Sequence, residues 1–198
     1  FYTDWNDQQV AVPLPENPNF SQTVNAGEST LYGGEVELQA LPARGLRLYS
    51  SLGLTESEFQ TFEFQGRDLA GFEFPGAPST TLATGAIYDR GTGPFGALNV
   101  NYVGEHYSEV GSIMEDGELA NDPRLRAGDY TTVDAQLGYT FRVFGTQTRL
   151  TAFARNLFDT VAVDRAFVSN DRNQPNGIRV DGRLRAPRVV GLSLRVDV

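Results

Sequence analysis

Apolar and polar residues alternate along most of this chain, and the clearest example runs from Thr132 to Phe141. Every second position there is apolar, at Val133, Ala135, Leu137, Tyr139 and Phe141. Successive side chains of a β-strand point to opposite faces, so this run predicts a strand with one apolar and one polar face.

The same alternation recurs and predicts eight strands in all. They are Phe1–Val12, Phe20–Leu41, Leu46–Phe59, Thr80–Tyr88, Phe95–Tyr107, Gly128–Phe141, Gln147–Phe158 and Leu184–Val198. Pro13, Pro15 and Pro18 predict a loop after the first strand, and residues 159–182 are expected to form the longest loop.

Short connections alternate strictly with longer ones along the chain. Short turns follow Leu41, Tyr88 and Phe141, and every other connection is longer. Antiparallel strands then carry all short turns at one end of the sheet, as in outer-membrane barrels, whose strands need ~9–11 residues to cross the bilayer. The pattern therefore predicts an all-β, transmembrane antiparallel β-barrel with lipid outside and water inside.

Charged residues support this assignment of faces. Arg149 and Arg155 alternate with apolar residues in their strand, which places them on the predicted lumen side. An arginine facing lipid near the membrane centre costs roughly 2–4 kcal/mol. Arg188 is in phase with the apolar face of the last strand, and we expect its side chain to reach the membrane interface.

Composition narrows the functional classes. The chain has 198 residues, a net charge of −9 and a pI near 4.6, so it lacks the basic character of a nucleic-acid binder. It contains no Cys, which excludes disulfides and thiol chemistry. No apolar run reaches the ~18 residues of a membrane helix, a test that does not detect barrel strands. The alternation has already begun at Phe1, so we expect the chain to be part of a longer protein.

Three weak motifs occur in a characteristic order. They are Tyr130-Thr131-x-Val133-Asp134, Asn156-Leu157-Phe158-Asp159 and Pro187-Arg188-x-x-Gly191-Leu192, preceded by Asn25-Ala26-Gly27 and Tyr32-Gly33-Gly34-Glu35-Val36-Glu37. As an ordered set over roughly residues 20–198, they resemble the C-terminal part of the barrel of a TonB-dependent outer-membrane receptor.

This resemblance implies that the chain supplies about eight C-terminal strands of a barrel of about 22 strands. An N-terminal plug, which couples to TonB, lies outside residues 1–198. The implied function is active, TonB-energised import of a scarce solute, with an iron–siderophore complex as the default, and not an enzyme activity. Long loops are expected to be extracellular and the C-terminus periplasmic. Such chains usually end on an aromatic residue, whereas this sequence ends at Val198.

The implied partners are outer-membrane lipid, TonB through the plug, a small-molecule or metal-chelate ligand and a surface lipoprotein. No cofactor and no nucleic acid are expected. The candidate ligand-contacting residues are loop aromatics and the single histidine, although packing within the loops is the favoured role for the phenylalanines: Phe62, Phe64, Phe72, Phe74, His106 and Tyr107.

No catalytic or metal-binding residues are predicted. Glu35 and Glu37 form a carboxylate pair on the lumen side, which we interpret as part of a barrel wall and not as a glycosidase pair. The acidic stretch Met114–Glu118 with Asp122 offers oxygen ligands, but it does not match EF-hand spacing. One histidine and no cysteine leave a zinc site or a His-based triad without ligands in this chain.

Two other functions stay open at this point. A complete eight-stranded barrel with a structural or adhesive role requires the first and last strands to pair. A soluble, carbohydrate-binding β-sandwich requires two packed sheets, and it does not explain the alternation of short and long connections.

Overall fold

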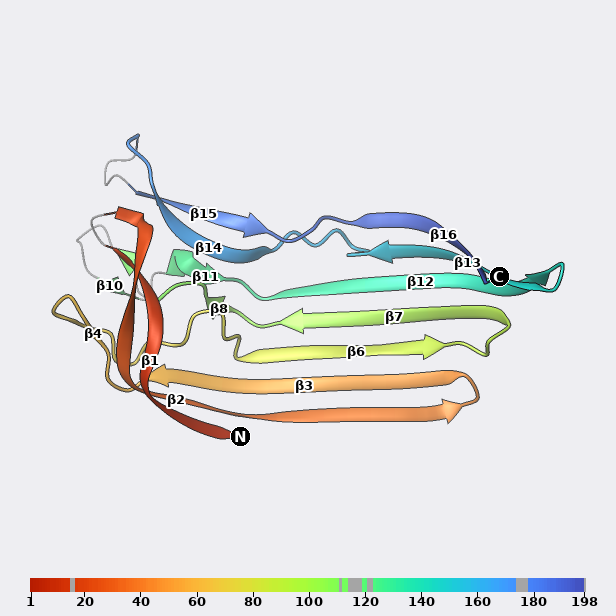
Figure 1. Ribbon diagram of the computed structural model, residues 1–198, viewed down its shortest axis with the longest axis horizontal. Coiled ribbons are helices and arrows are strands. Elements are labelled where there is room, and N and C mark those ends of the chain that lie inside the picture. The colour runs from red at the N-terminus through yellow and green to blue at the C-terminus, as the bar shows by residue number, and fades with distance from the viewer. Residues whose placement is uncertain (15–16, 111, 114–118, 121–122, 174–177, 198) are drawn as a thin grey trace.

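The computed structural model describes residues 1–14, 17–110, 112–113, 119–120, 123–173 and 178–197. Its main feature is one antiparallel sheet of eight strands that follow each other in chain order (Figure 1). These strands are β1 (Tyr2–Leu14), β2 (Asn17–Ala43), β3 (Leu46–Phe59), β6 (Thr80–Tyr88), β7 (Gly93–Val103), β12 (Tyr130–Val143), β13 (Thr146–Arg155) and β16 (Val189–Asp197). The prediction of eight antiparallel strands is confirmed.

The three short turns lie at one end of this sheet and the longer connections at the other (Figure 1). Residues 44–45, 89–92 and 144–145 form what we call the short-turn end. The tip of the β1–β2 hairpin and the described residues of 60–79, 104–129 and 156–188 form the long-loop end. Gly45, Gly91 and Gly145 have φ values of +82°, +82° and +86°, a left-handed backbone that favours glycine at these turns.

The long-loop end contains more regular structure than the sequence predicted. Small strands form hairpins or bridges there: β4 (Glu63–Phe64) with β5 (Arg67–Asp68), β8 (His106–Tyr107) with β11 (Arg126–Ala127), and β9 (Ser112–Ile113) with β10 (Leu119–Ala120). One 3-10 turn, η1, spans Pro123–Leu125. No helix in the described part of the chain is long and apolar enough to cross a membrane.

The prediction of one long loop over residues 159–182 is wrong. Strands β14 (Val163–Asn170) and β15 (Ile178–Leu184) pair there as a hairpin outside the main sheet. Its apolar residues Ala166 and Val168 are buried against Leu125, but arginines and aspartates alternate closely with them. This high charge hid the strand pattern in the sequence.

Several strand ends also differ from the prediction. β1 extends past Pro13 to Leu14, and β2 already begins at Asn17. The register shifts between Pro13 and Leu14, and such an irregularity accommodates a proline, which has no N–H. β2 is 27 residues long, or ~90 Å if fully extended, so the hairpin extends well beyond its neighbours. β7 ends at Val103, four residues earlier than expected, and β13 ends at Arg155 instead of Phe158.

The last strand begins at Val189, not at Leu184, which belongs to the separate hairpin. Arg188 therefore precedes β16, and its backbone N–H donates to the carboxylate of Asp159 at 2.8 Å. Arg188 thus lies one residue outside the strand in which it was expected, and the contact of its side chain with the membrane interface stays a prediction.

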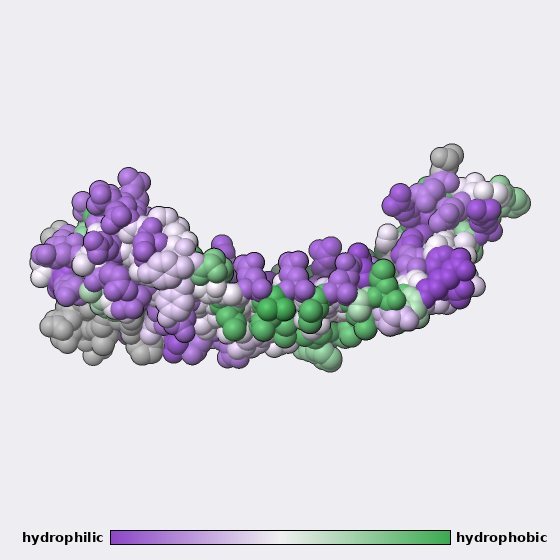
Figure 2. Space-filling view, turned by 90° about the horizontal axis from the view of Figure 1, so that it is seen from below, coloured by the Kyte–Doolittle hydropathy of each residue, from purple (hydrophilic) through white to green (hydrophobic). Residues whose placement is uncertain are grey.

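The two faces of the sheet differ as the alternation predicted. One face carries exposed apolar side chains from most of the long strands, among them Val36, Leu38, Leu48, Leu98, Leu137, Leu150, Leu192 and Leu194. The opposite face carries Glu35, Glu37, Arg149 and Arg195 in the intervening positions. Figure 2 shows the apolar band on one side of the sheet and polar side chains on the hollowed side.

Three aromatic rings on the polar face lie over glycines of the next strand. Tyr49 is paired with Gly85, Phe95 with Gly138 and Phe153 with Gly191. A Cβ atom at any of these glycines would meet the ring. Glycine is therefore needed at these three positions for the close approach of the aromatic side chain.

Strands β1 and β16 form the two edges of the sheet and are not paired with each other in the described residues. The requirement for a complete eight-stranded barrel is therefore not met. The eight long strands also form a single layer, and not the two packed sheets of a β-sandwich.

Candidate functional site

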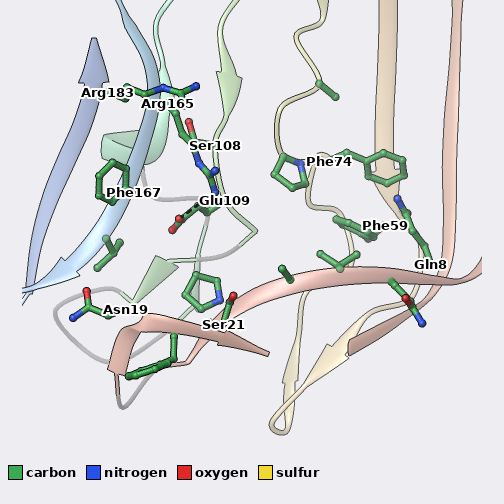
Figure 3. Close-up of a pocket in the computed structure, with 18 of the residues that line it drawn as sticks. Gln8, Asn19, Ser21, Phe59, Phe74, Ser108, Glu109, Arg165, Phe167 and Arg183 are labelled. Carbon is green, nitrogen blue, oxygen red and sulfur yellow. Dashed lines mark ion pairs between the residues drawn. The ribbon is translucent and has the colours of Figure 1, made fainter. Parts of the chain in front are cut away.

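A large cleft lies at the long-loop end, where segments from both halves of the chain meet. Its volume is about 830 Å³. The tip of the β1–β2 hairpin, the β3–β6 connection, residues 108–109 and the β14–β15 hairpin line it (Figure 3). Strand β14 packs against β2, although these strands belong to opposite ends of the chain.

The cleft opens toward the polar face of the sheet. Leu31 and Phe59 line it, and they are paired in phase with Glu35 of β2 and Ser57 of β3 on that face. Ser57 Oγ also accepts a hydrogen bond of 3.0 Å from the backbone N–H of Phe74. The β3–β6 connection is therefore folded inward over the polar face.

An aromatic cluster holds this connection in place. Phe59 is fully buried, and its ring centroid lies 5.0 Å from that of Phe62 and 4.8 Å from that of Phe74. Trp5 of β1 contacts Phe74, with their centroids 5.9 Å apart. Aromatic pairs at these distances contribute roughly 0.5–1.5 kcal/mol each beyond the burial of their area.

The predicted ligand-contacting phenylalanines divide between the core of the loops and the wall of the cleft. Phe62 and Phe64 are buried in the loop core, and Phe72 is partly buried against it. Only Phe74 among the six candidates lines the cleft. A role of these residues in ligand contact stays a prediction.

His106 and Tyr107 form strand β8 and do not line the cleft. The His106 ring is buried, with Nδ1 3.2 Å from the carbonyl oxygen of Gly104. Tyr107 is covered by the guanidinium of Arg126, 5.4 Å from its ring centroid. Both residues therefore hold the loop together in this arrangement, and their contact with a ligand stays a prediction.

The most unusual polar group of the cleft is Glu109, which the sequence did not single out. Its side chain is 14% exposed, and Oε1 lies 3.9 Å from a guanidinium nitrogen of Arg165. Burial raises the pKa of Glu109, against the opposing effects of a hydrogen bond from the Val168 backbone and of the Arg165 charge. No sequence motif surrounds Glu109, so only the packing of β14 reveals its environment.

The arginines beside the cleft already have acidic partners. Arg183 and Arg185 both contact the carboxylate of Asp164, at 2.6 Å and 3.0 Å. The hydrogen bond from Arg183 is the largest cause that lowers the pKa of Asp164. The rim of the cleft is therefore electrically balanced and not strongly positive.

A second polar cluster lies on the polar face near the short-turn end. Arg149 donates to Asp89 at 2.8 Å, and its guanidinium carbon lies 3.4 Å from the ring centroid of buried Phe95. The backbone N–H of Gly91 and then Arg149 lower the pKa of Asp89. These contacts hold the turn between β6 and β7 against β13.

The motif at residues 156–159 also stabilises the fold through hydrogen bonds. The Asn156 side chain is buried and bonded to both backbone groups of Thr160 and to the carbonyl of Ala186. The Asn156 backbone N–H donates to Asp134 of β12. This asparagine joins the two ends of the β14–β15 insertion to the main sheet.

Metal binding is not supported by the described part of the chain, which contains no group of three or more His, Cys, Asp or Glu residues arranged around one point. The acidic candidates Met114–Glu118 and Asp122 lie outside the described residues.

Comparison with known families matches residues 1–157 to the family described as "TonB dependent receptor-like, beta-barrel". Three solved structures of similar fold are the ferric yersiniabactin uptake receptor FyuA from Yersinia pestis, the ferric preacinetobactin receptor BauA from Acinetobacter baumannii and the ferric-catecholate import receptor Fiu from Escherichia coli K12. Their sequence identities are 24%, 18% and 16%, and their TM-scores 0.69, 0.62 and 0.62.

Each comparison covers nearly all of this chain but only part of the solved one. The chain is covered to 100%, 98% and 98%, whereas FyuA, BauA and Fiu are covered to 26%, 26% and 23%. The chain thus spans about a quarter of the length of the receptors that it matches. At these identities the likeness shows the fold.

Proposed function

Because this chain belongs to the TonB-dependent receptor β-barrel family, we propose that it is part of an outer-membrane receptor that imports a scarce solute with energy from TonB. An iron–siderophore complex is the default cargo, since two structural neighbours are a ferric yersiniabactin uptake receptor and a ferric preacinetobactin receptor. Cobalamin, other metal complexes and oligosaccharides are the alternatives.

The observation that carries this proposal is the position of the cleft above a polar wall. The cleft at the long-loop end opens toward the same face that carries Glu35, Glu37 and Arg149. A solute captured by the loops can therefore pass along hydrogen-bonding side chains toward the short-turn end. The opposite face carries exposed apolar side chains on most of the long strands, as contact with lipid requires.

In the proposed mechanism, binding and transport are separate steps without covalent chemistry. The loops bind the cargo with aromatic surfaces and hydrogen bonds, and TonB, pulling on the plug, opens a path through the lumen. The long-loop end is extracellular in this proposal, and the short-turn end and the C-terminus are periplasmic. A surface lipoprotein as a further partner stays a prediction.

The test uses the full-length gene in its own host. Cells with the gene, cells without it and cells lacking TonB are supplied with 55Fe chelates of several siderophore classes. We expect accumulation that requires both the gene and TonB. Uptake that continues unchanged after TonB deletion refutes the proposal, whereas TonB-dependent uptake of a chelate of another metal would change only the cargo.

A further inference from the structure

A hollow of about 510 Å³ interrupts the apolar face of the sheet near the short-turn end. Strands β3, β6, β7 and β12 line it, and the lining residues that belong to the apolar face include Leu46, Ala86, Tyr88, Gly96, Leu98 and Leu137. Only two lining residues have polar side-chain groups, and one of them, Gln136, belongs to the opposite face. A hydrocarbon chain therefore suits this hollow better than a polar solute.

Tyrosines mark the short-turn side of the hollow. Tyr88 lines it, and Tyr139, which is 54% exposed, is paired on the apolar face with the lining residue Pro94. Tyrosine gathers where the apolar band of a barrel meets the lipid headgroups. The turns beyond these two residues therefore lie at headgroup level, and the hollow lies just inside it.

The short-turn end is basic, although the chain as a whole carries a net charge of −9. Residues 43–47, 88–95, 141–149 and 194–197 contain six arginines and only two acidic residues, Asp89 and Asp197. Both aspartates already have a partner, since Arg149 lies 2.8 Å from Asp89 and Arg195 lies 2.7 Å from Asp197. The other arginines of this end are therefore not neutralised by an acidic partner among the described residues.

Two of these arginines stand next to the hollow. Arg44 and Arg90 each lie two residues beyond a lining residue, Leu46 and Tyr88, or at most about 7 Å along the backbone. A Cβ atom at Gly45 would lie 2.6 Å from Cγ of Arg90, so the Arg90 side chain covers the neighbouring β2–β3 turn. Both arginines are exposed, and two guanidinium groups from adjacent turns are thus available on the short-turn side of the hollow.

An anionic phospholipid combines the two chemistries that this surface offers. Guanidinium groups bind phosphate oxygens through paired hydrogen bonds, and basic sites beside an apolar membrane surface attract anionic headgroups. Figure 2 shows strongly hydrophilic side chains at the short-turn end, directly beside the apolar band.

We propose that the hollow binds an acyl chain of an anionic phospholipid whose phosphate contacts Arg44 and Arg90. The inference rests on the proposed function only in taking the apolar face to contact lipid. It assigns this lipid a fixed place on the receptor wall, on the face opposite to the one toward which the cleft opens.

The test uses the purified full-length receptor in detergent, with dipalmitoyl phosphatidylglycerol and dipalmitoyl phosphatidylcholine as probes of equal chain length. Native mass spectrometry measures the dissociation constant of the first bound lipid. We expect phosphatidylglycerol to bind about tenfold more tightly, because only its headgroup carries a net negative charge for the two arginines. Inorganic phosphate should not displace it, since the acyl chain is part of the contact.

A double substitution locates the headgroup. Arg44→Gln with Arg90→Gln should remove the preference for phosphatidylglycerol. Arg142→Gln with Arg195→Gln is the matched control, because it removes the same charge from the same end. Arg142 lies five residues beyond Leu137, and β16, which carries Arg195, contributes no lining residue. The control should keep the wild-type preference.

A filling substitution locates the acyl chain independently of charge. Ala86→Phe should weaken binding of both lipids several-fold, whereas Val190→Phe, on the apolar face of β16 and outside the hollow, should not.

Four results would overturn the inference. They are equal affinity for the two lipids, equal loss of preference in the two double variants, unchanged lipid binding in folded Ala86→Phe, and displacement of the lipid by inorganic phosphate. A receptor dimer that dissociates in Ala86→Phe would instead assign the hollow to a second copy and would also overturn it. The 55Fe uptake test does not read lipid binding, so failure here and failure of the proposed function are distinguished.

Discussion

Asn156 offers the sharpest test of how the long-loop end is built. Its backbone has φ = +48°, a left-handed conformation in which asparagine is tolerated better than alanine. Its side chain makes three hydrogen bonds, of 2.9–3.2 Å, to Thr160 and Ala186. Asn156→Ala removes all three bonds and adds backbone strain.

The magnitude follows from these contacts. Three partly buried hydrogen bonds at roughly 0.5–1.5 kcal/mol each, with about 1 kcal/mol for the left-handed backbone, give a local cost of roughly 3–5 kcal/mol. Asn156→Gly loses the bonds but not the backbone preference, so it should cost about 1 kcal/mol less. Asn156→Asp places a carboxylate against two carbonyl oxygens and should be at least as harmful as alanine.

Hydrogen–deuterium exchange on the full-length receptor measures this local stability. Amides of residues 157–162 and of Arg185, Ala186 and Arg188 should exchange roughly a hundred- to several thousandfold faster in Asn156→Ala, because each 1.4 kcal/mol is a factor of about ten. Phe158→Ala is the control, since that side chain is 73% exposed. Exchange at the wild-type rate in Asn156→Ala would show that the side-chain bonds do not hold the insertion.

Three further predictions concern the sheet and its turns. Gly138→Ala should destabilise the barrel by roughly 1–3 kcal/mol in thermal unfolding, because the new methyl group meets the Phe95 ring and the backbone oxygen of Leu150. Gly34→Ala is the control, since a methyl group there meets nothing within 4 Å and should leave the stability unchanged. Asp89→Asn should lower the melting temperature at neutral pH. The pKa of Asp89 is lower in the folded than in the unfolded protein, so the charged carboxylate stabilises the fold at a pH above the unfolded value of about 4. This stabilisation is lost as the pH falls through the folded-state pKa. The difference in melting temperature between variant and wild type should therefore vanish in acid. Leu192→Arg should reduce assembly in the outer membrane, with a cost of roughly 2–4 kcal/mol if the side chain faces lipid, while Ser193→Arg on the polar face should assemble normally in a heat-modifiability gel assay.

The strand pattern was readable from the sequence because it depends on local geometry. A period of two in hydrophobicity is a direct consequence of the pleat, and it located β3 and β6 with correct ends. The same period assigned Arg149 and Leu150 to opposite faces. The turns were equally local, since glycine with positive φ closes each of the three.

The long-loop end was not readable in this way. Strands β14 and β15 pair as a hairpin despite their high charge, because their few apolar residues find buried partners in η1, a segment far away in the sequence. Likewise, the phenylalanines of the β3–β6 connection have the same spacing whether they pack inward or face a ligand. Only their contacts with β1 and β2 showed that Phe62 and Phe64 are buried.

The sequence by itself thus determined the eight-stranded antiparallel sheet, its two unlike faces and the family to which the chain belongs, because those properties follow from side-chain alternation, turn residues and ordered motifs. The tertiary structure decided where the cleft lies and placed Glu109 in its wall. That outcome depends on β14 meeting β2 across the sheet. Whether a loop carboxylate becomes buried is a property of segments brought together in space, which no local pattern in the chain encodes.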